Sequence, residues 1–296
     1  MTTKLVMPKT GARIPPLQKA SVGPYVRAEY DKSIYTWGVP NNLIKTMAWL
    51  PSLALTEVAY ANSFIFDVGT YAPWPDPEDA KKNVIYPLAG FVDRVTKELV
   101  INTVSLMNRS RYSITHHSVI GFNTLSAELP LKDAKDRAGL AEAMLLHLVN
   151  GNGEPDFEGK KTSTGQPLYT PFQLLALQFA VAIHRDAHSV TDELFESITS
   201  EATKTARLQI KSGPLTEHGT AEKYVQSYVR SMLVELAWCI CHFNGLLNGW
   251  FTVLRVMDEV DATTDELDFV GVYNTVVPES IRVRNNALLG KSGWGC

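Results

Sequence analysis

A carboxylate, two hydroxyls and an imidazole occur in this order within residues 98–117. They are Glu98, Ser110, Ser113 and His117. On a helix that begins near Ser110, positions 110, 113 and 117 lie within about 60° of one another and face one point. A carboxylate and an imidazole can accept and donate protons near neutral pH once burial has tuned them. This stretch therefore indicates general acid-base chemistry.

The expected roles follow from the residue types. Glu98 would orient or deprotonate His117, and His117 would act on the substrate. Ser110, Ser113 and Tyr112 supply hydrogen-bond donors at the start of a helix, where backbone N–H groups favour a carboxylate or a developing oxyanion. Such a site suits enolate chemistry, which includes decarboxylation, C–C or C–O lysis, isomerisation and hydrolysis.

The histidine next to the pair and the serines leave alternatives open. His116 lies about 100° from His117 on a helix, so it is either a second substrate-binding group or a surface or interface residue. Ser113 and His117 are one helical turn apart, which allows a serine nucleophile, although no strained turn exposes Ser113. Ser110 and Ser113 could also be ordinary helix caps, and Glu98 with His117 an ion pair in a binding protein without catalysis.

The same spacing resembles that of the AhpD-like and carboxymuconolactone decarboxylase proteins, in particular their peroxidase-related branch. That family carries a glutamate, a Cys-x-x-Cys pair that starts twelve residues later, and a histidine four residues beyond the second cysteine. Glu98, Ser110, Ser113 and His117 fall on these four positions, and the similarity extends over about residues 40–255. The resemblance implies an AhpD-like helical bundle that assembles into a homodimer or a larger homo-oligomer.

The departure from the family decides the expected reaction. Peroxide reduction needs thiolates of low pKa, and serine hydroxyls at 110 and 113 cannot replace them. We therefore expect no alkylhydroperoxide reduction. We expect a cofactor-independent lyase, decarboxylase or isomerase that acts on a small organic acid, lactone or carbonyl compound through Glu98, His117 and Ser113. Ser110, Tyr112 and His116 would bind this substrate. The alternatives are a hydrolase that uses Ser113 and a non-catalytic binding protein.

The surrounding pattern predicts an all-α protein, because apolar residues recur at three- and four-residue spacing. Only 270–277 alternates as a strand would. We expect three parts: an extended N-terminal arm over 1–39, a helical domain over 40–256, and a C-terminal tail over 257–296 that either docks or is mobile. The domain would contain a loop over 151–171, which is a lid or a solvated insertion. We also expect a helix from Asn41 or Asn42 and one continuous helix over 224–256.

Composition excludes several classes of function. The 28 Lys and Arg residues against 31 Asp and Glu are scattered, so nucleic-acid binding is not expected. The most apolar segment, 233–243, is about half the length needed to cross a bilayer. With no secretory signal pattern at the start, we expect a cytoplasmic protein. Cys239, Cys241 and His242 show no recognised spacing of metal ligands, so no metal and no cofactor are predicted.

Overall fold

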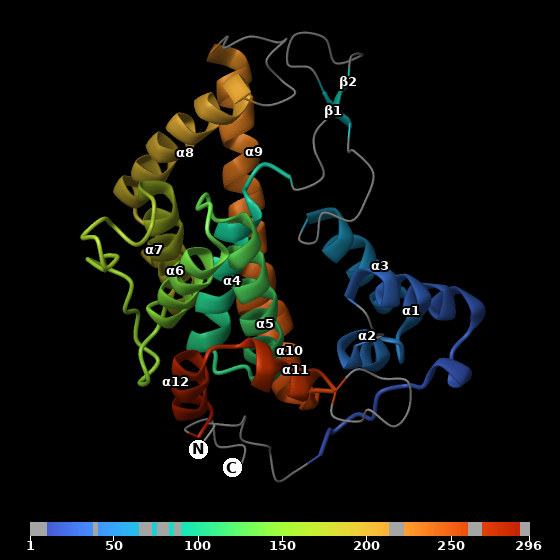
Figure 1. The fold of residues 1–296 in the computed structure, drawn as a ribbon. Helices are drawn as coiled ribbons and strands as arrows, with labels where there is room; N and C mark the ends of the chain where they lie inside the picture. The colour runs from blue at the N-terminus through green and yellow to red at the C-terminus, as the bar shows by residue number, and fades with distance from the viewer. Residues whose placement is uncertain are drawn as a thin grey trace.

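The computed structural model describes residues 11–37, 41–64, 73–75, 83–85, 90–212, 222–259 and 268–290. Helices dominate these segments, which confirms the predicted all-α class (Figure 1). Two three-residue strands, β1 (Pro73–Pro75) and β2 (Asn83–Ile85), pair antiparallel. No helix in the described segments is long and apolar enough to cross a membrane.

A hairpin of two helices, α4 (Arg94–Met107) and α5 (Arg111–Glu128), forms the centre of the molecule. Every residue of α4 from Arg94 to Leu106 is buried. The turn between the two helices passes through Arg109, whose φ of 50° is left-handed. Helices α6 (Ala134–Leu146), α7 (Pro171–Arg185) and α9 (Glu222–Cys241) pack against the hairpin, and α8 (Asp192–Ser212) packs against α7 and α9 (Figure 1).

The continuous helix predicted over 224–256 is interrupted. After α9 the chain forms a π-helical turn, η4 (His242–Leu247), and then α10 (Asn248–Leu254). Arg255 ends α10 in a left-handed conformation. A π-helical turn changes the angular register of the residues that follow it and often occurs at functional sites. Here it faces α4, with which it is in contact.

The extended arm predicted over 1–39 is correct only for part of that segment. Residues 24–37 form α1 (Pro24–Trp37), and a short 3-10 turn, η1 (Lys19–Ser21), precedes it. Val26 and Tyr30 are buried one helical turn apart on α1, and this short apolar stripe was missed in a segment rich in Pro and Gly. The predicted helix start at Asn41 or Asn42 is confirmed, because the Asn41 side chain caps α2 (Asn42–Met47). Helix α3 (Pro51–Phe64) follows.

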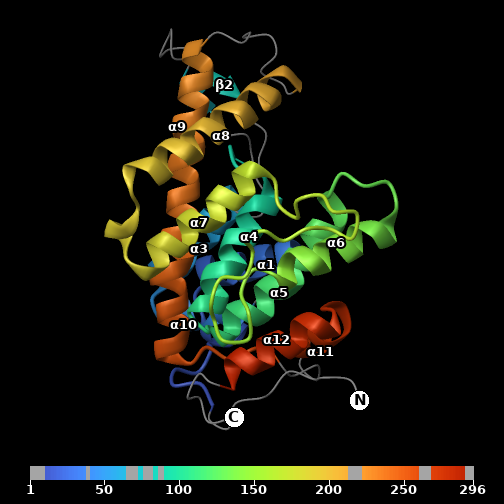
Figure 2. The same ribbon diagram turned by 90° about the vertical axis from the view of Figure 1, so that its left-hand side faces the viewer.

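The described part of the C-terminal tail docks on the helical body. It forms α11 (Phe269–Val276), which contacts α5, and α12 (Glu279–Leu289), which contacts α6 (Figure 2). Buried Arg284 donates from Nη1 to the backbone carbonyls of Leu145, Leu146 and Val149, at 3.0–3.1 Å. An arginine at this place satisfies carbonyls that the end of α6 leaves without helical partners. The last six residues of the predicted tail, 291–296, lie outside the described segments.

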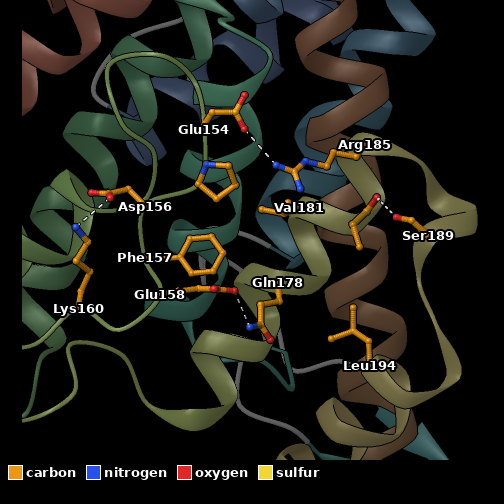
Figure 3. A pocket seen from close by; sticks show the side chains of 12 residues that line it. Glu154, Asp156, Phe157, Glu158, Lys160, Gln178, Val181, Arg185, Ser189 and Leu194 are labelled. Carbon is orange, nitrogen blue, oxygen red and sulfur yellow. Dashed lines mark hydrogen bonds and ion pairs between the residues drawn. The ribbon is translucent and has the colours of Figure 1, made fainter.

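The segment 151–171 is a loop, as predicted, and packs against the body. Phe157, Leu168 and Tyr169 are buried, and the Tyr169 hydroxyl donates to Met144 O at 2.6 Å. A groove of about 750 Å³ runs between this loop and α7 (Figure 3). Among the described residues, the loop forms no hydrogen bond, ion pair or ring contact with Glu98 or His117, so the lid interpretation stays a prediction.

Candidate active site

The structure brings Glu98 and His117 together across the contact between α4 and α5. His117 Nδ1 lies 3.0 Å from Glu98 Oε2. The Glu98 side chain is fully buried, and 8% of the His117 side chain is exposed. The spacing argument thus located a real side-chain pair, whose catalytic role remains a prediction.

Arg94 binds the other oxygen of the same carboxylate. Its Nη2 donates to Glu98 Oε1 at 2.5 Å. Burial alone would raise the pKa of Glu98, but the charge of Arg94 and the hydrogen bonds from His117 and Arg94 hold it below its ordinary value. Glu98 is therefore an ionised acceptor, and a neutral His117 must place its proton on Nδ1. The lone pair of that ring is then on Nε2, for which the described residues provide no hydrogen-bond partner.

Two further contacts fix the orientation of the pair. The Asn102 side chain donates from Nδ2 to the backbone carbonyls of Glu98 and His117, both at 2.9 Å, and so ties α4 to α5. Gly121 makes room for it, because a Cβ there would lie 2.8 Å from Asn102 Nδ2. The rings of His117 and Phe243, which lies in η4, are nearly perpendicular, with centroids 4.8 Å apart. The imidazole is therefore held between a buried carboxylate and an aromatic ring.

The two serines lie at the start of α5, as predicted. Ser110 occupies the N-cap position, but its side chain makes no capping bond, and its buried Oγ has no partner among the described residues. The interpretation of Ser110 as an ordinary helix cap is therefore wrong. Ser113 Oγ lies 2.7 Å from Ser105 Oγ. Ser105 in turn receives a long hydrogen bond from Asn248 Nδ2, at 3.5 Å.

Sequence reasoning missed Ser105 and Asn248. Ser105 could have been found, since it is seven residues after Glu98 and positions two turns apart share a helix face. Asn248 carried no such signal, because it follows the π-helical turn and its direction depends on that turn. Both residues are buried.

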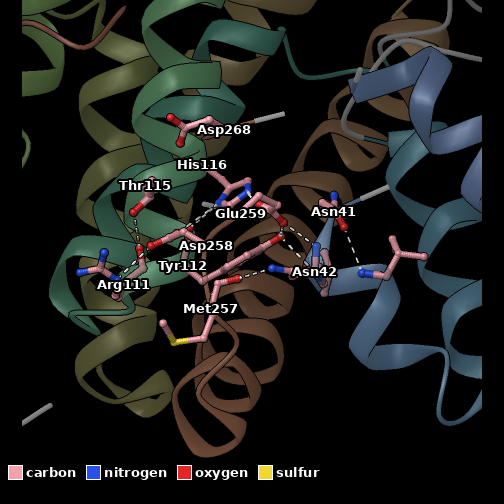
Figure 4. A network of polar contacts seen from close by, with 12 residues as sticks. Asn41, Asn42, Arg111, Tyr112, Thr115, His116, Met257, Asp258, Glu259 and Asp268 are labelled. Atoms are coloured by element: carbon pink, nitrogen blue, oxygen red, sulfur yellow. Dashed lines mark hydrogen bonds and ion pairs between the residues drawn. The ribbon is translucent and has the colours of Figure 1, made fainter. Parts of the chain in front are cut away.

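Tyr112 and His116 belong to a different group of contacts (Figure 4). The Tyr112 hydroxyl donates to Glu259 Oε1 at 3.0 Å and accepts from the Leu43 N–H at 3.1 Å. His116 Nε2 lies 2.9 Å from Glu259 Oε2, and His116 Nδ1 lies 2.9 Å from the Tyr112 carbonyl. The polar atoms of both side chains are thus engaged inside the protein. This geometry disfavours the substrate-binding role predicted for them, and the surface position considered for His116 is wrong.

The contacts of His116 favour the charged form of its ring. Both ring nitrogens face acceptors, so both must carry protons. Burial opposes that charge, but Glu259 and Asp258 more than offset it, and the pKa of His116 lies above its ordinary value. The ring is also stacked between Tyr112 and Phe269, with both centroid distances at 4.0 Å.

The carboxylates around His116 join three distant parts of the chain. Glu259 Oε1 also accepts from the Asn42 N–H at 2.5 Å, at the start of α2. Asp258 Oδ2 lies 2.9 Å from Arg111 Nε, at the start of α5. We call the group of Arg111, Tyr112, His116, Asp258 and Glu259 the tail clamp. It fastens residues 257–259 and α2 to α5.

The metal ligands considered in the sequence do not converge in the described part of the chain. His242 Nε2 lies 3.3 Å from Glu57 Oε1, and Cys239 is buried while Cys241 is exposed. Within the described segments, no three His, Cys, Asp or Glu residues are arranged to hold a metal ion.

Comparisons with known proteins show the fold. No family model matches the sequence, and no curated protein matches it. A variant of the debrominase Bmp8 in complex with 2,3,4-tribromopyrrole matches with a TM-score of 0.51 and 15% identity, over 91% of this chain and all of that one (100%). An uncharacterized peroxidase-related protein from Silicibacter sp. TM1040 gives 0.50 and 12%, over 86% and 95%.

A third solved structure is the AhpD core of a peroxidase-related protein from Ralstonia eutropha JMP134, with a TM-score of 0.46, 16% identity and coverage of 84% and 92%. The chain shares its all-helical fold with the Silicibacter protein and the debrominase Bmp8, and the all-helical class agrees with the sequence prediction. At these identities the likeness concerns the fold alone.

Proposed function

We propose that this protein is a cofactor-independent acid-base enzyme, a lyase, decarboxylase or isomerase, that acts on a small organic acid, lactone or carbonyl compound. The observation that carries the proposal is the bond between His117 Nδ1 and the buried Glu98 carboxylate. It leaves Nε2 of a neutral imidazole as the only basic atom of the ring. Among the solved structures with this fold, one belongs to a debrominase, which supports a small-molecule enzyme in general terms.

The pair can move a proton without leaving an uncompensated charge. When His117 Nε2 removes a proton from a C–H bond next to a carbonyl, the ring becomes a cation bound to an ionised Glu98. A buried ion pair of this kind lowers the cost of the charged intermediate. The same nitrogen can then return the proton to a different atom, which completes an isomerisation. In a decarboxylation the C–C bond breaks, CO₂ leaves, and His117 that has taken a proton from solvent gives it to the remaining carbon.

The start of α5 can stabilise the negative oxygen that such a reaction creates. The first N–H groups of a helix lack helical acceptors, and α5 begins with the buried residues Arg111, Tyr112 and Ser113. Ser113 and His117 are one turn apart on α5. One small substrate can therefore place an oxygen beside the Ser113 hydroxyl and a C–H bond beside His117.

The hydrolase alternative has less support. A serine nucleophile needs a hydrogen bond to its base, and the hydrogen bond of Ser113 Oγ in the described residues is to Ser105 rather than to His117. The non-catalytic alternative is distinguished by experiment. The predicted homo-oligomer, cytoplasmic location and small-molecule partner also remain proposals.

Proton exchange in D₂O tests the proposal on simple compounds that carry an acidic C–H bond or a labile carboxylate. The protein is incubated with pyruvate, 3-oxobutanoate or γ-butyrolactone and followed by ¹H NMR. Exchange appears as loss of the C–H signal next to the carbonyl. Decarboxylation appears as conversion of the 3-oxobutanoate signals to those of the ketone that remains after CO₂ has left. We expect exchange or decarboxylation that both His117→Gln and Glu98→Gln reduce about a hundredfold or more. His147→Gln is the matched control, since His147 pairs with Asp156 at 3.0 Å but is about one-third exposed. Equal rates in all variants, or none with any compound, would refute the proposal for this class of substrates.

A further inference from the structure

Three buried residues from different parts of the fold converge on Ser105. The Ser110 N–H donates to the Ser105 carbonyl at 3.1 Å, Ser113 Oγ lies 2.7 Å from Ser105 Oγ, and Asn248 Nδ2 donates to Ser105 Oγ at 3.5 Å. All four residues are at most 1% exposed. Ser105 is thus the centre of a polar cluster at the junction of α4, α5 and α10.

Two atoms of this cluster lack partners in the described segments. Ser110 Oγ and Asn248 Oδ1 are buried and have no hydrogen bond. A buried polar group without a partner typically costs about 1–3 kcal/mol. A polar ligand at the start of this 18-residue helix would satisfy such atoms.

One arrangement of the hydroxyl protons links the side chains of Asn248, Ser105 and Ser113. A serine hydroxyl has one proton to give. Because Ser105 Oγ accepts from Asn248, its own proton is available for Ser113 Oγ. In this arrangement Ser113 accepts from Ser105, and its own proton can be donated to a ligand oxygen on the face of α5 that Ser113 shares with His117. Each bond in such a chain strengthens the next.

We propose that Asn248, acting through Ser105, positions Ser113 as a hydrogen-bond donor to a substrate oxygen, so that this subsite takes a carbonyl, carboxylate or enolate oxygen. Asn248 and Ser105 are positioning residues, and Ser113 is the group that touches the substrate. This inference rests on the proposed function for its substrate class. It assigns Ser113 to oxyanion binding and not to nucleophilic attack.

Oxalate is a suitable probe, because it is planar and presents the oxygens of a carboxylate next to those of a carbonyl equivalent. Its affinity is measured by titration calorimetry for the wild type, Ser113→Ala, Asn248→Leu and the double variant. Asn248→Leu changes no charge, so a loss of affinity cannot come from repulsion of the anion. We expect each single variant to bind oxalate about two- to tenfold more weakly, as for one neutral hydrogen bond.

The double variant separates positioning from a general structural effect. If Asn248 acts through Ser113, Asn248→Leu weakens binding in the wild type and causes no further loss in Ser113→Ala. Equal losses in both backgrounds, no loss from Asn248→Leu, or no oxalate binding by the wild type would overturn the inference. Ser105→Ala, the smaller change, is measured in the same two backgrounds in case Asn248→Leu does not fold, and thermal unfolding reports folding for every variant.

This measurement also separates the inference from the proposed function. Oxalate binding needs no turnover. A coupled loss of affinity without proton exchange on any compound would contradict the enzyme and leave the subsite standing. Proton exchange that depends on His117, together with uncoupled losses of oxalate affinity, would contradict the subsite alone.

Discussion

His116 and His117 are neighbours in the chain, yet each is bonded to a different buried glutamate. His116 Nε2 meets Glu259 at 2.9 Å, and His117 Nδ1 meets Glu98 at 3.0 Å. The difference lies in the second nitrogen. In His116 it also has an acceptor, the Tyr112 carbonyl, whereas His117 Nε2 is left for chemistry. One histidine therefore holds the tail clamp together, and the other is the candidate base.

Replacement of the carboxylate should affect catalysis more than binding. In Glu98→Gln the amide no longer compensates a charge on His117, and we expect kcat to fall about a hundredfold or more with little change in KM. Steady-state kinetics on the compound identified by proton exchange measure this. Asp156→Asn, which removes the partner of the partly exposed His147, is the control and should keep full activity. A fall confined to KM would contradict the role of Glu98 in proton transfer.

His116→Gln should weaken the fold and spare the chemistry. It leaves Glu259 buried without its cation, while Asp258 keeps Arg111, and loss of one partner of a buried pair typically costs about 3–5 kcal/mol. Urea unfolding measures the change, and activity per folded molecule should stay near that of the wild type. Full stability with lost activity would show instead that His116 takes part in the reaction.

The contribution of His116 to stability should depend on pH with a definite sign. Its pKa in the folded protein lies above the ordinary value of 6.5, so the folded state binds the proton more tightly than the unfolded state. The stabilisation is complete below pH 6.5 and is lost as pH rises through the raised pKa. The difference in unfolding free energy between wild type and His116→Gln should therefore shrink as pH rises from about 6 to about 9. A constant difference over that range would contradict a charged His116.

The spacing along 98–117 predicted the candidate pair because helix geometry alone determines which residues share a face. It could not place Tyr112 and His116, since their partners are Asp258 and Glu259, far along the chain. No local pattern shows where that segment returns to α5.

Two further elements could not be predicted from local sequence patterns. Residues 270–277 alternate as a strand would, but they lie in α11 and the loop after it, because Phe269, Tyr273 and Val277 are buried at four-residue spacing. The π-helical turn η4 has no signature in the sequence, so the direction of Asn248 could not be derived. Propensity and spacing are local, and tertiary packing decides where they are ambiguous.

Gly121→Ala should disturb the active pair indirectly. The added Cβ would lie 2.8 Å from Asn102 Nδ2, the atom that ties Glu98 to His117, and overpacking of this kind costs about 1–3 kcal/mol. We expect lower stability together with lower kcat. Gly139→Ala is the matched control: it also lies in a helix, no atom lies within 4 Å of its added Cβ, and alanine favours helix by about 0.5–1 kcal/mol. Equal behaviour of the two variants would contradict the role given to Gly121.

The central claim is that the neutral imidazole of His117 carries its proton on Nδ1 and its lone pair on Nε2. Long-range ¹H–¹⁵N NMR of ¹⁵N-histidine-labelled protein reads this tautomer directly, with His117→Gln to assign the signal. The account predicts a protonated Nδ1 and an unprotonated Nε2 in the wild type, and a mixture of tautomers in Glu98→Gln. A wild-type ring protonated at Nε2, or the same tautomer populations in both proteins, would contradict it.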